Sequence, residues 1–116
     1  LVIKKAREIY KNDSLLKITN DPYAAAKGSN VLYTDVWSSM GEENQKKEKD
    51  IDFNGFTIDG DLVKMADKNA IILHCLPAYR NKEITDSAME SENSRIFQQA
   101  ENRLHAQQGL LACLLS

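Results

Sequence analysis

Side chains that could do chemistry follow two apolar segments of this sequence and precede the apolar part of a third. Asp35 ends the segment "VLYTD", while His74 and Cys75 follow the apolar run "AIIL". Arg103 lies in the polar opening of the last apolar segment. A carboxylate, a thiol and a guanidinium that meet at one place could bind an anionic substrate and move a proton.

Backbone geometry limits how these groups can pair. His74 and Cys75 are adjacent, so in an extended strand their side chains point to opposite faces. We therefore expect no Cys–His nucleophilic pair, and a buried structural histidine is the simpler interpretation of His74. A single Cys-His dipeptide has no zinc-ligand spacing, so no metal site is expected. Cys113 lies in an apolar helical pattern and is expected to be a small core residue.

Each candidate also has a plain structural interpretation. Asp35 could cap a turn, and Cys75 could be a small buried residue. Arg103 could be an ordinary surface cation. A cation near a helix N-terminus is slightly unfavourable, however, so an anionic partner would explain Arg103 better.

The elements that position these residues alternate between strands and helices. Alternation of this kind predicts parallel βαβ units, and hence an open parallel α/β sheet with helices on both faces, Rossmann-like in the broad sense. In such sheets ligands bind at the carboxyl ends of the strands, where Asp35 and Cys75 are expected. No G-x-G-x-x-G follows the first strand, so no dinucleotide site is expected. Strands are expected at 15–19, 30–35, 69–74 and 94–98, and helices at 1–11, 23–27, 42–50, 60–68, 84–90 and 99–115.

Composition narrows the functional class. The 116 residues are 42% hydrophobic and 28% charged, which suits one domain or one part of a larger protein. The net charge of −2 gives no basic surface for nucleic acid. No apolar run approaches a membrane span, and no signal peptide is recognised. The charged segment 42–50 is expected to be a solvated helix face. The first residue is Leu1, which suits a processed protein or a fragment.

Three stretches together carry a family resemblance. They are "YTDVWSSMGEE", "HCLPAYRNKEITD" and "IFQQAENRLHAQQGLLACLL", in this order over nearly the whole chain. The combination of "HCLP" with "ENRLH" resembles the C-terminal half of the ornithine carbamoyltransferase family, and "SMG" favours ornithine over other amines. The resemblance implies transfer of the carbamoyl group from carbamoyl phosphate to the δ-amine of L-ornithine, giving citrulline and phosphate in arginine metabolism.

The resemblance also assigns roles to residues of this chain. Cys75 is implied as the active-site residue beside the reacting amine, with Asp35 as its catalytic carboxylate. Ornithine is implied to bind to Asp35, Ser39 and Met40. Carbamoyl phosphate is implied to contact the backbone at Cys75 and Leu76 and the side chain of Arg103. A cis Leu76–Pro77 bond is implied, and no metal or organic cofactor is required.

Part of the family pattern is missing from this sequence. The chain has neither the Ser-x-Arg-Thr phosphate motif nor the His-Pro-x-Gln segment of the family's N-terminal domain. Residues 1–116 are therefore expected to be the L-ornithine-binding domain without the carbamoyl phosphate domain, and to be inactive alone. The last helix would then lack its packing partner. The resemblance implies a parent enzyme that is a homotrimer, or a multiple of trimers, in the cytoplasm, or in the mitochondrial matrix of a eukaryote.

Two alternatives remain open from the sequence. The chain could be a stand-alone α/β binding or interaction domain that keeps the fold without the reaction. It could also belong to a carbamoyltransferase for another amine, such as putrescine, although the SMG loop argues against this.

Overall fold

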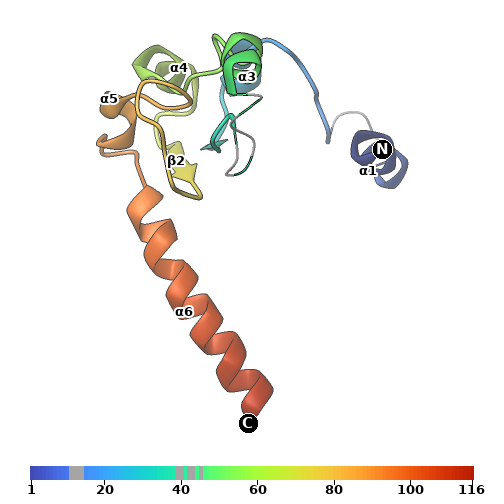
Figure 1. The fold of residues 1–116 in the computed structure, drawn as a ribbon, viewed down its shortest axis with the longest axis vertical. Coiled ribbons are helices and arrows are strands. Elements are labelled where there is room, and N and C mark those ends of the chain that lie inside the picture. The colour runs from blue at the N-terminus through green and yellow to red at the C-terminus, as the bar shows by residue number, and fades with distance from the viewer. Residues whose placement is uncertain (11–14, 39–40, 42–43, 45) are drawn as a thin grey trace.

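The structure is a computed structural model that describes residues 1–10, 15–38, 41, 44 and 46–116. Among these residues two short strands are separated and flanked by pairs of helices, most of which are labelled in Figure 1. The elements are α1 (Val2–Ile9), α2 (Pro22–Ala26), β1 (Val31–Thr34), α3 (Lys46–Asp52), α4 (Gly60–Met65), β2 (Ile71–His74), α5 (Asp86–Met89) and α6 (Ile96–Leu115).

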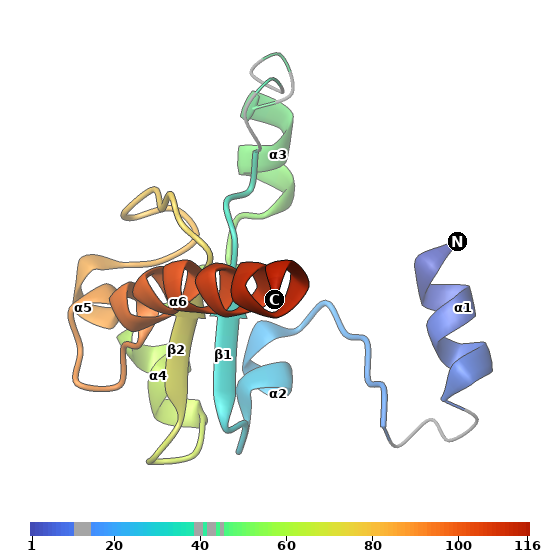
Figure 2. The ribbon, with the colours of Figure 1, turned by 90° about the horizontal axis from the view of Figure 1, so that it is seen from below.

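Two parallel strands form the sheet of the described residues. β1 pairs with β2 in a register that places Val31 opposite Ile71 and Thr34 opposite His74. α4 lies on one side of β2 and α6 on the other, and α2 contacts α4 (Figures 1 and 2). The expected α/β architecture with a parallel sheet is confirmed. Because the strands run in the same direction and in register, the residues that follow them meet at one edge.

Two of the four predicted strands, 15–19 and 94–98, are not strands in the structure. Residues 15–19 form no strand, and the side chains of Leu15 and Ile18 are exposed. A strand needs a neighbour for its backbone groups, and none of the described residues lies beside this segment as a paired strand. Around residue 94 the chain does bond to β2, through Ile72 N–H to the Asn93 carbonyl and Arg95 N–H to the Ile72 carbonyl. That ladder ends at once because α6 begins at Ile96.

Apolar side chains from the sheet and from the helices around it form the core. Ile72, Ile84 and Ile96 have no exposed surface, and they join the strand β2, the loop before α5 and the start of α6. Burial of such side chains is the main source of stability in a domain of this size. The other buried members of the cluster are Ala26, Leu32, Ile58, Leu62, Ala88 and Met89.

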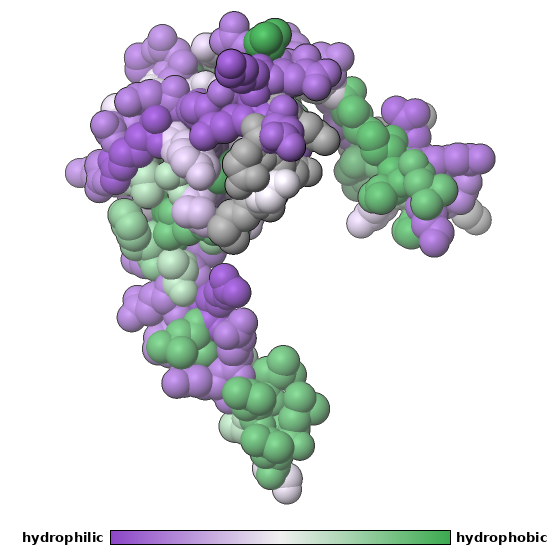
Figure 3. All heavy atoms as spheres, in the orientation of Figure 1, coloured by the Kyte–Doolittle hydropathy of each residue, from purple (hydrophilic) through white to green (hydrophobic). Residues whose placement is uncertain are grey.

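Helix α6 extends away from this core, and only its first residue is buried (Figure 1). Its apolar end is uncovered in the described chain, as the green end of the helix in Figure 3 shows. Cys113 lies there and is exposed, so the prediction of a core position was wrong for this chain. The apolar pattern was real, but nothing among the described residues packs against it. No helix of the described residues has both the length and the hydropathy needed to cross a membrane.

Candidate active site

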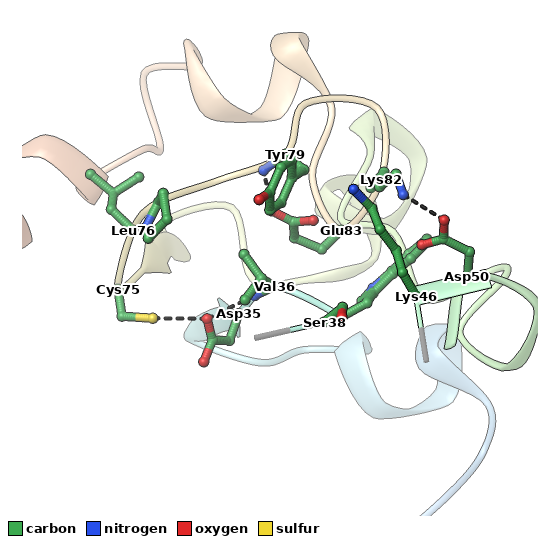
Figure 4. A pocket seen from close by; sticks show the side chains of 12 residues that line it. Asp35, Val36, Ser38, Lys46, Asp50, Cys75, Leu76, Tyr79, Lys82 and Glu83 are labelled. Carbon is green, nitrogen blue, oxygen red and sulfur yellow. Dashed lines mark hydrogen bonds and ion pairs between the residues drawn. The ribbon is translucent and has the colours of Figure 1, made fainter. Parts of the chain in front are cut away.

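The side chains of Asp35 and Cys75 meet where β1 and β2 end. The strand pairing closes with Thr34 opposite His74, so Asp35 and Cys75 are the next residue on each strand. The Cys75 thiol donates a hydrogen bond of 3.0 Å to Asp35 Oδ1 (Figure 4). The same oxygen accepts the backbone N–H of Val36 at 2.7 Å. The predicted meeting of this carboxylate and this thiol is present in the structure.

This contact shifts the pKa values of the two groups in opposite directions. The hydrogen bond from the Cys75 thiol, followed by that from Val36 N–H, lowers the pKa of Asp35. The hydrogen bond to Asp35, then burial and the negative charge of Asp35, raise the pKa of Cys75. The carboxylate is therefore ionised and the thiol protonated near neutral pH. Since the thiolate is the nucleophilic form of cysteine, Cys75 acts here as a hydrogen-bond donor.

We expect the alkylation of Cys75 by iodoacetamide to report this coupling directly. With Cys113→Ala as background, Cys75 is the only thiol of the chain. Replacing Asp35 by Asn weakens the hydrogen-bond acceptor and removes the charge that both raise the pKa of the thiol, so the pH at which alkylation becomes fast should fall. The measurement is the alkylation rate against pH, followed by mass spectrometry. An unchanged or raised midpoint in Asp35→Asn would contradict the coupling.

A cavity of about 280 Å³ lies beside the Asp35–Cys75 pair. One wall comes from the ends of the two strands, and the other comes from α3 and the loop after β2 (Figure 4). Leu76, predicted from the family resemblance, lines it. The remaining lining residues are Val36, Trp37, Ser38, Lys46, Asp50, Pro77, Tyr79, Lys82 and Glu83.

Sequence reasoning missed the charged side chains of this cavity. Lys46 Nζ lies 5.3 Å from the centre of the Tyr79 ring, and Lys82 Nζ pairs with Asp50 Oδ2 at 2.6 Å. Lys46 and Asp50 belong to the charged segment that was interpreted as a solvated face. The pattern of charges along this helix does not indicate that the helix packs against a loop that lies far along the chain. These contacts attach α3 to the loop after β2.

One predicted residue, Arg103, does not join the pair, and two others cannot be compared with it. Ser39 and Met40 lie outside the described residues. Arg103 is exposed in the first half of α6 and does not line the cavity. Another side chain of the same helix does reach the strand ends, because Gln99 Oε1 accepts the N–H of His74 at 3.1 Å. The role of Arg103 therefore stays a prediction.

The side chain of His74 lies buried in the core beside the Asp35–Cys75 pair. It is fully buried, and its Nε2 lies 3.1 Å from Glu83 Oε1, while its Nδ1 accepts the N–H of Leu76 at 2.9 Å. The interpretation of His74 as a buried structural histidine fits these contacts. Sequence reasoning did not identify Glu83, because a single acidic residue in a polar loop gives no sign of burial.

Asp35, His74 and Cys75 also form a group that could be considered for a metal ion. One ligand atom from each lies within 4.8 Å of the others. Both ring nitrogens of His74 already have hydrogen-bond partners, so a metal ion would have to displace Leu76 N–H or Glu83. The arrangement therefore favours a hydrogen-bonded site, and the expectation that the reaction needs no metal stays a prediction.

Comparison with known proteins identifies the family. Residues 1–114 match the family described as "Aspartate/ornithine carbamoyltransferase, Asp/Orn binding domain". The chain belongs to this family. The Asp35–Cys75 pair and the cavity therefore lie in a chain of this family, and the roles that the resemblance implied for the pair stay predictions. The structure also has the implied cis bond between Leu76 and Pro77.

Individual relatives of this Asp/Orn binding domain carry a common name. It is 75% identical over 115 residues to an ornithine carbamoyltransferase of Prochlorococcus marinus subsp. pastoris, covering 99% of this chain and 37% of the relative. It is 48% identical over 114 residues to the ornithine carbamoyltransferase of Nostoc punctiforme, with 98% and 37% covered. The chain thus spans a little over a third of the length of these relatives.

Solved structures agree with this assignment. The ornithine carbamoyltransferase of Pyrococcus furiosus matches at 49% identity and a TM-score of 0.73, over 79% of this chain and 29% of that one. The ornithine transcarbamoylase of Giardia lamblia matches at 29% identity and a TM-score of 0.79, over 95% and 35%. An acetylornithine transcarbamylase in complex with acetylcitrulline matches at 34% identity and a TM-score of 0.68, over 81% and 29%.

Proposed function

We propose that this domain is the ornithine-binding part of an ornithine carbamoyltransferase. The parent enzyme transfers the carbamoyl group of carbamoyl phosphate to the δ-amine of L-ornithine, giving citrulline and phosphate in arginine metabolism. The observation that supports the proposal most strongly is the Asp35–Cys75 hydrogen bond beside a cavity, in a chain 75% identical to an ornithine carbamoyltransferase.

The protonation states of the pair suit the reaction. An ionised Asp35 attracts the cationic ornithine, and with Ser39 and Met40 it binds the amino-acid end of the substrate. The δ-amine attacks only as the neutral base, so its surroundings must favour loss of a proton. A protonated Cys75 donates its proton to Asp35, so its sulfur can accept a hydrogen bond from that amine without itself carrying a negative charge that would hold the ammonium form.

The loop after β2 suits the carbamoyl group. The N–H of Leu76 is already bound to His74 Nδ1, so the carbonyl is the backbone group of Leu76 that a substrate can use. A carbonyl accepts hydrogen bonds, which fits the amide NH2 of carbamoyl phosphate. Arg103 carries the guanidinium that matches phosphate oxygens, and it would stabilise the negative charge that develops during transfer.

The proposal includes a second part of the parent protein. These residues span 37% of the Prochlorococcus relative, and the uncovered apolar end of α6 offers a surface for the remainder. The 116 residues alone are accordingly proposed to be inactive. The family resemblance supports a homotrimer, or a multiple of trimers, as the parent assembly. It also supports a cytoplasmic location, or the mitochondrial matrix in a eukaryote.

A chimera tests this function. We would join the part of the Prochlorococcus marinus subsp. pastoris enzyme that precedes the matched region to these 116 residues, and call the product the chimera. We expect the chimera to form citrulline from ornithine and carbamoyl phosphate, and the 116 residues alone to form none. A folded chimera that makes no citrulline would contradict the proposal, and citrulline formation by the isolated chain would contradict the need for a second part.

A further inference from the structure

Two buried polar side chains have no role in the function proposed above: Glu83, which lines the cavity, and His74, which lies behind it. His74 and Glu83 are both fully buried, and their side chains are joined by a contact of 3.1 Å between Nε2 and Oε1. Burying two such groups is costly unless each has hydrogen-bond partners. Glu83 nevertheless has one oxygen, Oε2, without a partner in the described part of the chain. The pair is therefore kept at a cost, which calls for an explanation beyond packing.

The hydrogen bonds define the tautomer of His74. Nδ1 lies 2.9 Å from the backbone nitrogen of Leu76, which can only donate, so Nδ1 must be the unprotonated acceptor. The proton of the neutral ring is then on Nε2, where it is donated to Glu83 Oε1. An acceptor at Oε1 favours this tautomer over the other one. Glu83 thereby determines which nitrogen faces Leu76.

The bond from Leu76 N–H holds an unfavourable backbone conformation. Leu76 has a φ of 56°, in the left-handed region that residues with a side chain seldom adopt. Such a conformation is unfavourable for a residue with a side chain and persists only where the surroundings impose it. Glu83 Oε1 also accepts the N–H of Tyr79 at 2.5 Å, on the far side of the same loop. The loop that carries Cys75 and Leu76 into the cavity is thus held at both ends by the buried pair.

We propose that His74 and Glu83 are positioning residues for the carbamoyl transfer, Glu83 by setting the tautomer of His74 and His74 by holding Leu76 N–H. This orients the Leu76 carbonyl and keeps the Cys75 thiol against Asp35. The inference rests on the proposed function, because the orientation of this loop affects catalysis only if the carbamoyl transfer takes place at this site. Neither residue touches a substrate in this account.

Two substitutions of His74 separate positioning from packing. The Oδ1 of an asparagine can take the place of Nδ1, since asparagine commonly accepts the N–H two residues ahead. A glutamine is closer to histidine in size and reaches Glu83, but it offers no acceptor at the place of Nδ1. If packing is the only role, His74→Gln is the milder change. If positioning is the role, His74→Asn is the milder change.

We expect the chimera with His74→Gln to lose about 100-fold in kcat, because a misplaced reactive group costs that much, with the KM for ornithine changed by less than about threefold. His74→Asn should stay within about tenfold of the unmodified chimera. Glu83→Gln, which weakens the acceptor by removing its charge, should cost about fivefold in kcat. In the His74→Asn background the same change should cost less than about twofold, because no tautomer remains to be set.

Three results would overturn the inference. They are equal losses in the two His74 variants, a smaller loss for His74→Gln, and the same loss for Glu83→Gln in both backgrounds. Glu92→Gln, an exposed change outside the cavity, serves as the matched control and should leave kcat unchanged. If the unmodified chimera makes no citrulline, the proposed function fails by itself. The effects of the variants are then compared through the midpoint pH of Cys75 alkylation by iodoacetamide. His74→Gln should shift this midpoint more than His74→Asn.

Discussion

Replacing Cys75 with alanine is expected to lower the kcat of the chimera by about two to three orders of magnitude, the range that a positioned proton-handling group contributes. The thiol is the group that bonds Asp35 at the end of the two strands. Its loss removes the sulfur proposed to lie beside the reacting amine and also the hydrogen bond that lowers the pKa of Asp35. Steady-state citrulline formation at saturating carbamoyl phosphate measures the effect.

The chain contains a matched control for this substitution. Cys113 is its other cysteine, and it lies exposed on the part of α6 that extends from the core. Cys113→Ala removes the same thiol without changing the cavity, so kcat should stay within about twofold of the unmodified chimera. Near-normal turnover in Cys75→Ala would remove the catalytic role of this residue. Equal losses of kcat in both variants would indicate that the substitutions perturb the folded protein and do not report a catalytic role of Cys75.

The second large effect is expected from Ile72→Ala, in the middle of β2. Ile72 has no exposed surface and belongs to the core cluster that joins the sheet to α6. Truncating such a side chain leaves a cavity and should lower the free energy of unfolding by about 2 to 5 kcal/mol. Urea denaturation of the chimera, followed by circular dichroism, gives the shift for the transition of this domain.

Val31→Ala is the control for that measurement, because Val31 begins the neighbouring strand and is 47% exposed. Its removal should cost less than about 1 kcal/mol, as surface changes usually do. A shift for Ile72→Ala no larger than that for Val31→Ala would contradict the placement of Ile72 at the centre of the core.

The sequence predicted the part of the site that depends on strand direction. Parallel strands end at a common edge, so Asp35 and Cys75 could be expected to meet before any coordinates were known. The alternation of side chains along a strand also predicted that His74 and Cys75 would not form a nucleophilic pair, and the ring nitrogens of His74 bond to Glu83 and Leu76 instead, although the ring stays within 4.8 Å of the thiol. Both inferences need only local patterns and the handful of topologies that such patterns allow.

The errors arose where a neighbour decides the structure. The segment 94–98 is rich in strand-forming residues, yet Ile96 and Phe97 open α6, and Ser94 makes only an isolated bridge to Ile72. The segment 15–19 has a strand pattern but no described strand beside it. The apolar end of α6 led to a different error. Cys113 lies in an apolar pattern that predicts burial, but it is exposed because none of the described residues packs around it.

The charged wall of the cavity could not be predicted for a related reason. Lys82 and Asp50 are 32 residues apart in the chain, and their ion pair exists only because α3 folds against the loop after β2. The backbone of Glu83 likewise pairs with a residue far away in the chain, since Ile58 N–H donates to the Glu83 carbonyl. Contacts over such sequence distances leave no periodic pattern in a single chain.

The central claim is that this domain selects L-ornithine as the acceptor, and kcat/KM of the chimera for ornithine and for putrescine tests it most directly. Putrescine has the same reacting amine but lacks the carboxylate of an amino acid. A site built to bind that end should therefore prefer ornithine by at least about 100-fold. A kcat/KM for putrescine equal to or above that for ornithine would contradict the assignment of ornithine to this site.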